Sequence, residues 1–215
     1  MRAKARATLA FAVATLVAMA AGGCRDQRGN DVDAARRAPT VTVGGEERLQ
    51  GWTPPRIEVT RDNAQALAER ADEALADGRF ADDEAASLPL FMALREYPPM
   101  RARASAGVRH SIDGLLLQAR RQLGQIDEDP DALRHVRHAA AVLRVVALER
   151  GDVQRFLQQV DRVEDGQHFS ELGEAALARG DVGETGGDGA LAWFRQALAL
   201  RATDARARQG LAASE

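Results

Sequence analysis

His135 and His138 are the residues of this chain whose types and spacing best suit metal chemistry. Their separation by three places two imidazoles on one face of a helix, where both can bind one metal ion. Arg134 and Arg137 flank them, and no third ligand is evident nearby. A solvated helix face is the preferred interpretation, so the sequence predicts neither a metal site nor a cofactor.

Residues 183–189 form a glycine-rich stretch, a composition that phosphate-binding and cation-binding loops share. It lacks the Lys-Ser/Thr pair of a phosphate-binding loop, and Asp181, Glu184 and Asp188 do not have the spacing of an EF-hand. We therefore expect a connector here. The chain also lacks the GxSxG, HExxH, GxGxxG and paired CxxC patterns. These observations predict that the protein is not an enzyme.

Residues 1–23 have the layout of a secretory signal peptide. Three basic residues, Arg2, Lys4 and Arg6, precede an uncharged apolar run at residues 8–21. A membrane-spanning helix needs roughly 20 apolar residues, so this run is too short to cross a bilayer comfortably. The sequence predicts that the chain is exported and that these residues are removed.

Residues 21–24, Ala-Gly-Gly-Cys, resemble the lipobox of bacterial lipoproteins, in which the cysteine is acylated and becomes the new N-terminus. Cys24 is the only cysteine of the chain, which favours lipidation and excludes an intrachain disulfide. The motif departs from the family at Ala21, where Leu is more frequent, and cleavage after Ala20 would leave a soluble periplasmic protein. The resemblance, with Arg25 after the cysteine, implies an outer-membrane lipoprotein of a Gram-negative bacterium that faces the periplasm.

Removal of the signal peptide makes the chain more acidic. It leaves 26 basic against 32 acidic residues, a formal net charge of about −6. The remaining basic residues are all arginines, and they are scattered among acids as on a solvated helical surface. A nucleic-acid partner is therefore not expected.

Residues 24–60 are expected to form the lipidated N-terminus and a flexible linker, because they are polar and have no helical periodicity. Within the linker, residues 52–59 have extended character, since each proline restricts itself and the residue before it. Two alternatives remain open for this stretch. Trp52 and Ile57 dock on the first helices as a latch, or the stretch is an exposed linker.

Residues 61–215 are expected to form one all-α domain, because apolar residues recur there with helical spacing and no convincing strand pattern follows residue 60. The Asp129-Pro130-Asp131 sequence marks the start of the fourth helix, and Thr203 is the expected cap of the last. About eight helices are expected, near residues 61–77, 81–96, 100–123, 130–151, 153–160, 168–179, 190–200 and 204–213.

A short phrase occurs three times in this helical region: ALADGRF at residues 74–80, ALERGDV at 147–153 and ALARGDV at 176–182. An apolar helix end, a glycine and a new helix together predict a helical hairpin. The first and last copies are 102 residues apart, three times a period of about 34. The middle copy does not keep that period, so the repeat is expected to be irregular.

The last copy belongs to a unit that resembles the tetratricopeptide repeat family, in which small residues let paired helices approach closely. The resemblance covers residues 61–215, with two good units and a degenerate centre. It implies an irregular α-solenoid, although Ala202 stands where the family has proline. The residues that carry it are Leu172, Gly173, Ala176, Gly180, Asp181, Ala190, Phe194, Ala197 and Leu198, and the first unit repeats Phe194 as Phe91 and Gly210 as Gly107.

This resemblance implies a lipid-anchored periplasmic scaffold that binds a protein or peptide partner. Arg103 and Arg206 occupy matching positions in the two good units and are the candidates for binding carboxylates of that partner. Ordinary surface charge is the alternative. The last helix has no polar capping helix after it, which predicts self-association or docking at that end.

Two further functions remain open from the sequence. The chain is an N-terminal helical-repeat segment of, or a docking subunit for, a larger cell-envelope enzyme, such as relatives of formylglycine-generating enzymes. Alternatively, it is a structural envelope lipoprotein without a specific client.

Overall fold

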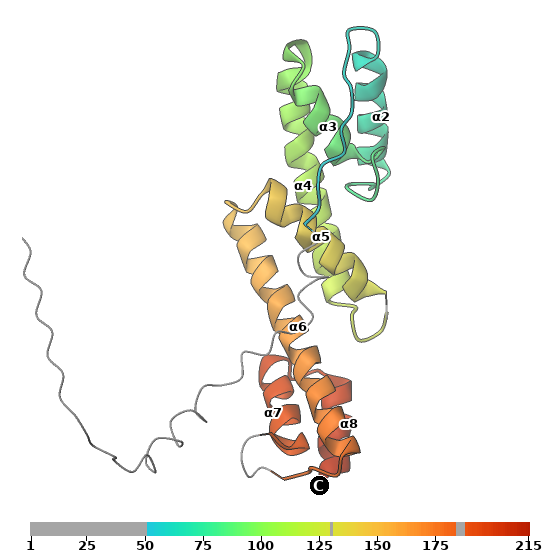
Figure 1. The fold of residues 1–215 in the computed structure, drawn as a ribbon. Helices are drawn as coiled ribbons and strands as arrows, with labels where there is room; N and C mark the ends of the chain where they lie inside the picture. The colour runs from blue at the N-terminus through green and yellow to red at the C-terminus, as the bar shows by residue number, and fades with distance from the viewer. Residues whose placement is uncertain (1–50, 130, 184–187) are drawn as a thin grey trace, which may run out of the picture. The chain divides into compact units, whose positions relative to one another are not determined.

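Helices make up the regular structure of this protein wherever the computed structural model describes it. The described residues are 51–129, 131–183 and 188–215, and they belong to one compact unit. Within these ranges there is no strand, so the predicted all-α class is confirmed, and no helix is long and apolar enough to cross a membrane. The elements are α2 (Ala64–Ala76), α3 (Ser87–Arg95), the 3-10 turn η2 (Pro98–Met100), α4 (Arg101–Leu123), α5 (Ala132–Val146), α6 (Gly151–Ala178), α7 (Ala190–Leu200) and α8 (Ala205–Ser214) (Figure 1).

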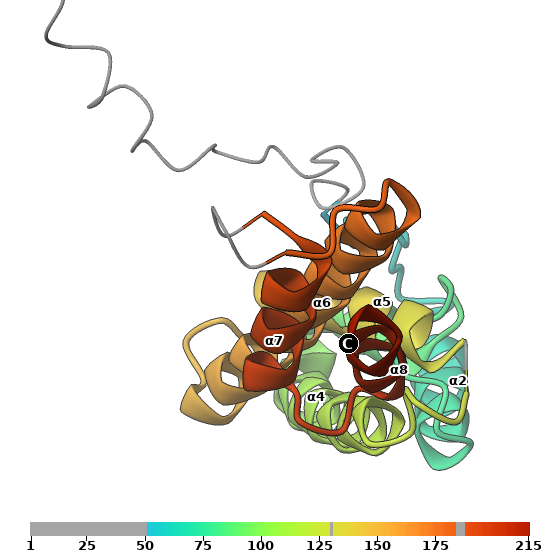
Figure 2. The same cartoon turned by 90° about the horizontal axis from the view of Figure 1, so that it is seen from below.

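Two hydrophobic clusters hold these helices together. The larger cluster contains residues of α2, α3, α4, α5 and the first half of α6. The smaller cluster joins the second half of α6 to α7 and α8 and includes the fully buried ring of Phe194. Because α6 contributes to both clusters, it connects them (Figure 2).

The fifth and sixth expected helices are a single helix, α6. The polar stretch after Val160 predicts a break between two helices, but the buried positions continue through that stretch at Val163 and Gly166. Gly166 lies inside α6 and not in a turn. A Cβ at this position would lie 3.8 Å from the carbonyl oxygen of Ala197, which places Gly166 against α7. The expectation of two helices is wrong because burial against α7 continues where local polarity suggested a loop.

Several other helix ends differ from expectation. The second helix starts at Ser87 rather than near residue 81, so Pro89 lies in its first turn, where no intrahelical hydrogen bond is lost. α5 starts at Ala132, and Asp129 accepts a hydrogen bond from the Asp131 amide at 2.9 Å just before it. Pro130 lies outside the described residues. α8 is capped by Asp204 instead of Thr203.

Residues 51–60, which we call the latch segment, run in an extended conformation alongside α2 and α3 (Figure 1). Trp52, Ile57 and Val59 are partly buried against the larger cluster, while Arg56 and Glu58 between them are exposed. Of the two alternatives for this stretch, the structure shows the docked one. From Pro55 to Thr60 the side chains alternate between partly buried and exposed, because successive side chains of an extended backbone point to opposite sides.

Candidate interaction surface

Two parts of the chain share one three-helix arrangement. In the first unit, residues 64–123, α2 packs against α3 and both pack against α4. In the last unit, residues 166–214, the second half of α6, α7 and α8 make the corresponding contacts. The expected offset of about 102 residues therefore relates two similar pieces of structure.

A glycine ends the first helix of each unit. Gly78 has a φ of 73° and Gly180 a φ of 75°, a left-handed conformation that glycine adopts without steric cost. The next amide donates a hydrogen bond to Ala74 O at 2.9 Å in one unit and to Ala176 O at 3.0 Å in the other. These bonds satisfy helix-end carbonyls and turn the chain toward the second helix.

The middle copy of the phrase has a different structure. The fourth expected helix does not extend to Gly151: α5 ends at Val146, and Gly151 is the first residue of α6. Arg150 lies 2.7 Å from Asp113 on α4 and 2.7 Å from Asp152, so this corner is held by ion pairs. Hydrogen bonding to Arg150 lowers the pKa of the Asp152 carboxyl to about 2.

A phenylalanine ring packs against a glycine in both units. A Cβ at Gly107 would lie 2.5 Å from the ring of Phe91, and one at Gly210 would overlap the ring of Phe194. Both rings are fully buried. The glycines let the third helix of each unit approach the second closely enough to cover the ring. Gly173 adds a second such surface for Phe194 in the last unit.

Arg103 and Arg206, the two candidates for partner binding, form matching ion pairs within the chain. Arg103 pairs with Asp72 on α2, and Arg206 pairs with Glu174 on α6, with Glu171 3.7 Å away. Hydrogen bonding to Glu174 raises the pKa of Arg206, although partial burial opposes this shift. Both arginine side chains remain 45–49% exposed, so solvent and a partner still reach them. Partner binding by these two residues stays a prediction.

The other sequence candidates are not brought together. Cys24 lies outside the described residues. His135 and His138 are exposed on α5, and the Nε2 atom of His138 lies 3.1 Å from Ala81 O. Across the described ranges, no three His, Cys, Asp or Glu side chains converge as metal ligands do.

A buried polar cluster before α8 was not anticipated from the sequence. Asp204 is 1% exposed, accepts a hydrogen bond from the Ala207 amide at 3.0 Å and lies 2.8 Å from Arg201. Burial raises the pKa of this carboxyl, but the hydrogen bonds from Ala207 and Arg201 outweigh burial, so the net shift is downward. Arg201 also lies 3.1 Å from Asp127 in the loop after α4. The available sequence signal was the spacing of three between Arg201 and Asp204.

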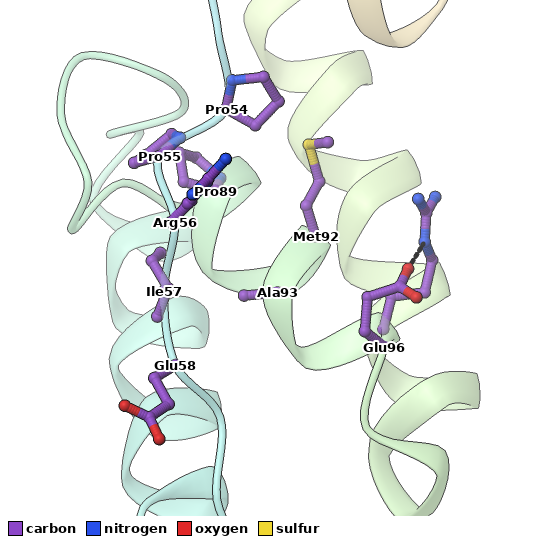
Figure 3. A pocket seen from close by; sticks show the side chains of 10 residues that line it. Pro54, Pro55, Arg56, Ile57, Glu58, Pro89, Met92, Ala93 and Glu96 are labelled. Atoms are coloured by element: carbon purple, nitrogen blue, oxygen red, sulfur yellow. Dashed lines mark ion pairs between the residues drawn. The ribbon is translucent and has the colours of Figure 1, made fainter.

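An open groove of about 450 Å³ lies between the latch segment and α3 (Figure 3). The side chain of Met92 extends along it toward Pro54, and Ala93 faces the latch segment. Arg95 and Glu96, 3.7 Å apart, lie at its rim. The groove is lined by Pro54, Pro55, Arg56, Ile57, Glu58, Pro89, Met92, Ala93, Arg95 and Glu96.

Comparisons of the chain with protein-family models, with curated proteins and with solved structures found no match.

Proposed function

We propose that this protein is a tetratricopeptide-like scaffold that binds a protein or peptide partner in the cell envelope. One observation carries the proposal: the same three-helix unit occurs twice, with the same glycine turn, the same Phe–Gly contact and the same Arg–carboxylate pair. Stacked helical hairpins of this kind form an α-solenoid, and such surfaces usually bind a peptide or a helix. The proposed role is binding without catalysis.

The proposed location rests on residues 1–24. A basic start, a short apolar run and small residues before Cys24 support export and lipidation of that cysteine. The lipid would hold the helical domain at the outer membrane, facing the periplasm. Mass spectrometry of the mature protein tests this part: an acylated Cys24 at the N-terminus is expected, and an unmodified N-terminus at Ala21 would contradict it.

Site-specific photo-crosslinking in the native envelope tests the binding role. A photoreactive residue replaces Met92 in the groove or Arg206 on α8, and replaces exposed Arg162 on α6 as the control. We expect one reproducible adduct from position 92 or 206 and none from 162. The adducted protein, once purified, should bind the full chain saturably with one-to-one stoichiometry. Absence of saturable binding by every adducted protein would contradict a scaffold and favour a structural lipoprotein.

A further inference from the structure

The latch segment is seated on the first unit in the way that an extended peptide is bound. Its inward side chains are Trp52, Ile57 and Val59, and its outward side chains at Arg56 and Glu58 are exposed. Figure 3 shows Pro54 to Glu58 running along α2 and α3, with Ala93 pointing toward this stretch. Alternate side chains of an extended segment point to opposite sides, so only those on one side contact the helices.

Few polar contacts hold this segment. Asn63 donates a side-chain hydrogen bond to Glu58 O at 3.0 Å and accepts one from the Thr60 amide at 2.8 Å. Within the described ranges, no backbone hydrogen bond joins residues 51–59 to a helix. The Ala64 amide of α2 donates a hydrogen bond to Thr60 O at 3.0 Å, at the end of the segment. The attachment of residues 51–59 therefore depends mainly on side-chain packing.

The surface beneath the segment suits an apolar extended chain and differs from the matching surface of the last unit. On α3 it consists of Pro89, Met92 and Ala93. The matching residues of α7, 103 positions later, are Ala192, Arg195 and Gln196. The last unit folds with this mainly polar surface, and the residues matching the latch segment belong to helix α6.

We propose that the surface of α2 and α3 beneath the latch segment, which we call its seat, is the peptide-binding groove of the scaffold. Residues 51–60 occupy this groove and can be replaced there by a segment of the partner. The partner supplies a segment of the same chemistry: an extended stretch with an aromatic residue, prolines and then alternating β-branched residues. The open volume of about 450 Å³ beside Met92 is continuous with this seat and leaves room for a larger side chain than the chain's own. This inference rests on the proposed function and specifies its binding site.

The latch segment competes with any free peptide for the same surface, and the experiment must allow for this competition. A segment tethered beside its seat has an effective concentration on the order of millimolar, so a free peptide displaces it poorly. The test therefore uses the full chain with Trp52→Ser and Ile57→Ser, which weaken the tethered segment. The probe is a fluorescein-labelled synthetic peptide with the sequence of residues 51–60, followed by fluorescence anisotropy.

We expect saturable binding of this peptide to the weakened chain and at least about tenfold weaker binding to the wild-type chain. Ala93→Arg in the weakened chain should abolish binding, whereas Gln196→Arg, the matched change on α7, should leave it unchanged. A control peptide with serine at both anchor positions should not bind. Absence of binding to the weakened chain, equal binding to the wild-type chain, or binding that survives Ala93→Arg overturns the proposal.

Limited proteolysis of the unmodified chain gives a second test that does not depend on the folding of a variant. Trypsin should cleave after Arg56 at least about tenfold faster than after exposed Arg70 on α2, since an exchangeable segment detaches by itself while the helix stays folded. Cleavage at both sites at one common rate would overturn the proposal. Because neither test uses the unidentified partner, their failure would leave the scaffold proposal to its own crosslinking test.

Discussion

The first and last units share their interior and differ in their surroundings. Inside each unit a buried phenylalanine meets a glycine, and a left-handed glycine ends the first helix. Outside, the latch segment covers α3 in the first unit, whereas the last unit has no extended segment on α7 within the described residues. The comparison shows that interior packing is repeated while the outer faces differ.

Equivalent apolar residues illustrate the same difference. Leu67 and Leu90 of the first unit are 8% and 2% exposed. Their counterparts in the last unit, Phe169 and Trp193, are only partly buried and stack with ring centroids 5.7 Å apart. A larger aromatic pair thus stabilises a less covered position, because stacking adds to burial.

Removal of the two buried rings should have the largest effect on stability. Phe91→Ala and Phe194→Ala should each lower the free energy of unfolding by about 3–5 kcal/mol, because each leaves a cavity in a packed core. Urea unfolding followed by circular dichroism measures this loss. Phe169→Ala, at a partly buried position, should cost clearly less. Equal losses for Phe169 and Phe194 would contradict the assigned interior.

The Phe–Gly contacts should behave as two separate pairs. Gly107→Ala and Gly210→Ala should each cost about 1–3 kcal/mol, because the added methyl group overlaps a ring. Phe91→Leu should reduce the cost of Gly107→Ala, whereas Phe194→Leu should add to it independently. Double-mutant cycles from urea midpoints measure the coupling. A coupling free energy between Gly107→Ala and Phe194→Leu as large as that between Gly107→Ala and Phe91→Leu would contradict two separate pairs.

Asp204 should be important for the last unit alone, since its counterpart in the first unit is Arg101. Asp204→Ala should cost about 1–3 kcal/mol at pH 7, because α8 loses its cap and Arg201 loses a partner. The folded-state pKa of Asp204 lies below 3.8, so its ionised form stabilises the fold above that value.

The difference between wild type and Asp204→Ala should therefore shrink as pH falls from about 5 through the folded-state pKa. Urea unfolding at several pH values measures it, with exposed Asp62→Asn as the control. A difference that grows toward acid pH would reverse the assigned sign.

The matched ion pairs should have the smallest effect on stability. Arg103→Ala and Arg206→Ala should each change the free energy of unfolding by less than about 1 kcal/mol, because both pairs are about half exposed. If these arginines contact carboxylates of the crosslinked partner, each substitution should reduce the binding free energy by more than it reduces the free energy of unfolding. Unchanged affinity in both variants would leave them as surface pairs only.

The repeated phrase indicates the repeated unit, but its three copies do not have the same structure. The copies at Gly78 and Gly180 do end helices, as predicted, because a left-handed glycine is a local requirement. The copy at Gly151 does not, because Arg150 and Asp152 form ion pairs there and α5 has already ended. The same short phrase thus adopts two different structures, and the ion pair of Arg150 with Asp113 on α4 distinguishes the middle copy.

The candidate site was only partly accessible to sequence analysis. The restricted backbone around Pro54 and Pro55 predicted an extended stretch, with docking as one of two alternatives. The groove also requires Met92 and Ala93 on α3, which nothing local connects to residues 54–58. The pairing of Arg206 with Glu174 was likewise missed, because it joins residues 32 positions apart.

The sequence by itself determined the all-α class, the helical periodicity and the two glycine turns, because these depend on residues within a few positions of one another. Only the tertiary structure decided that α6 is continuous, that the latch segment docks and that both candidate arginines pair within the chain. These outcomes depend on burial and charge supplied by distant residues, which local spacing does not encode.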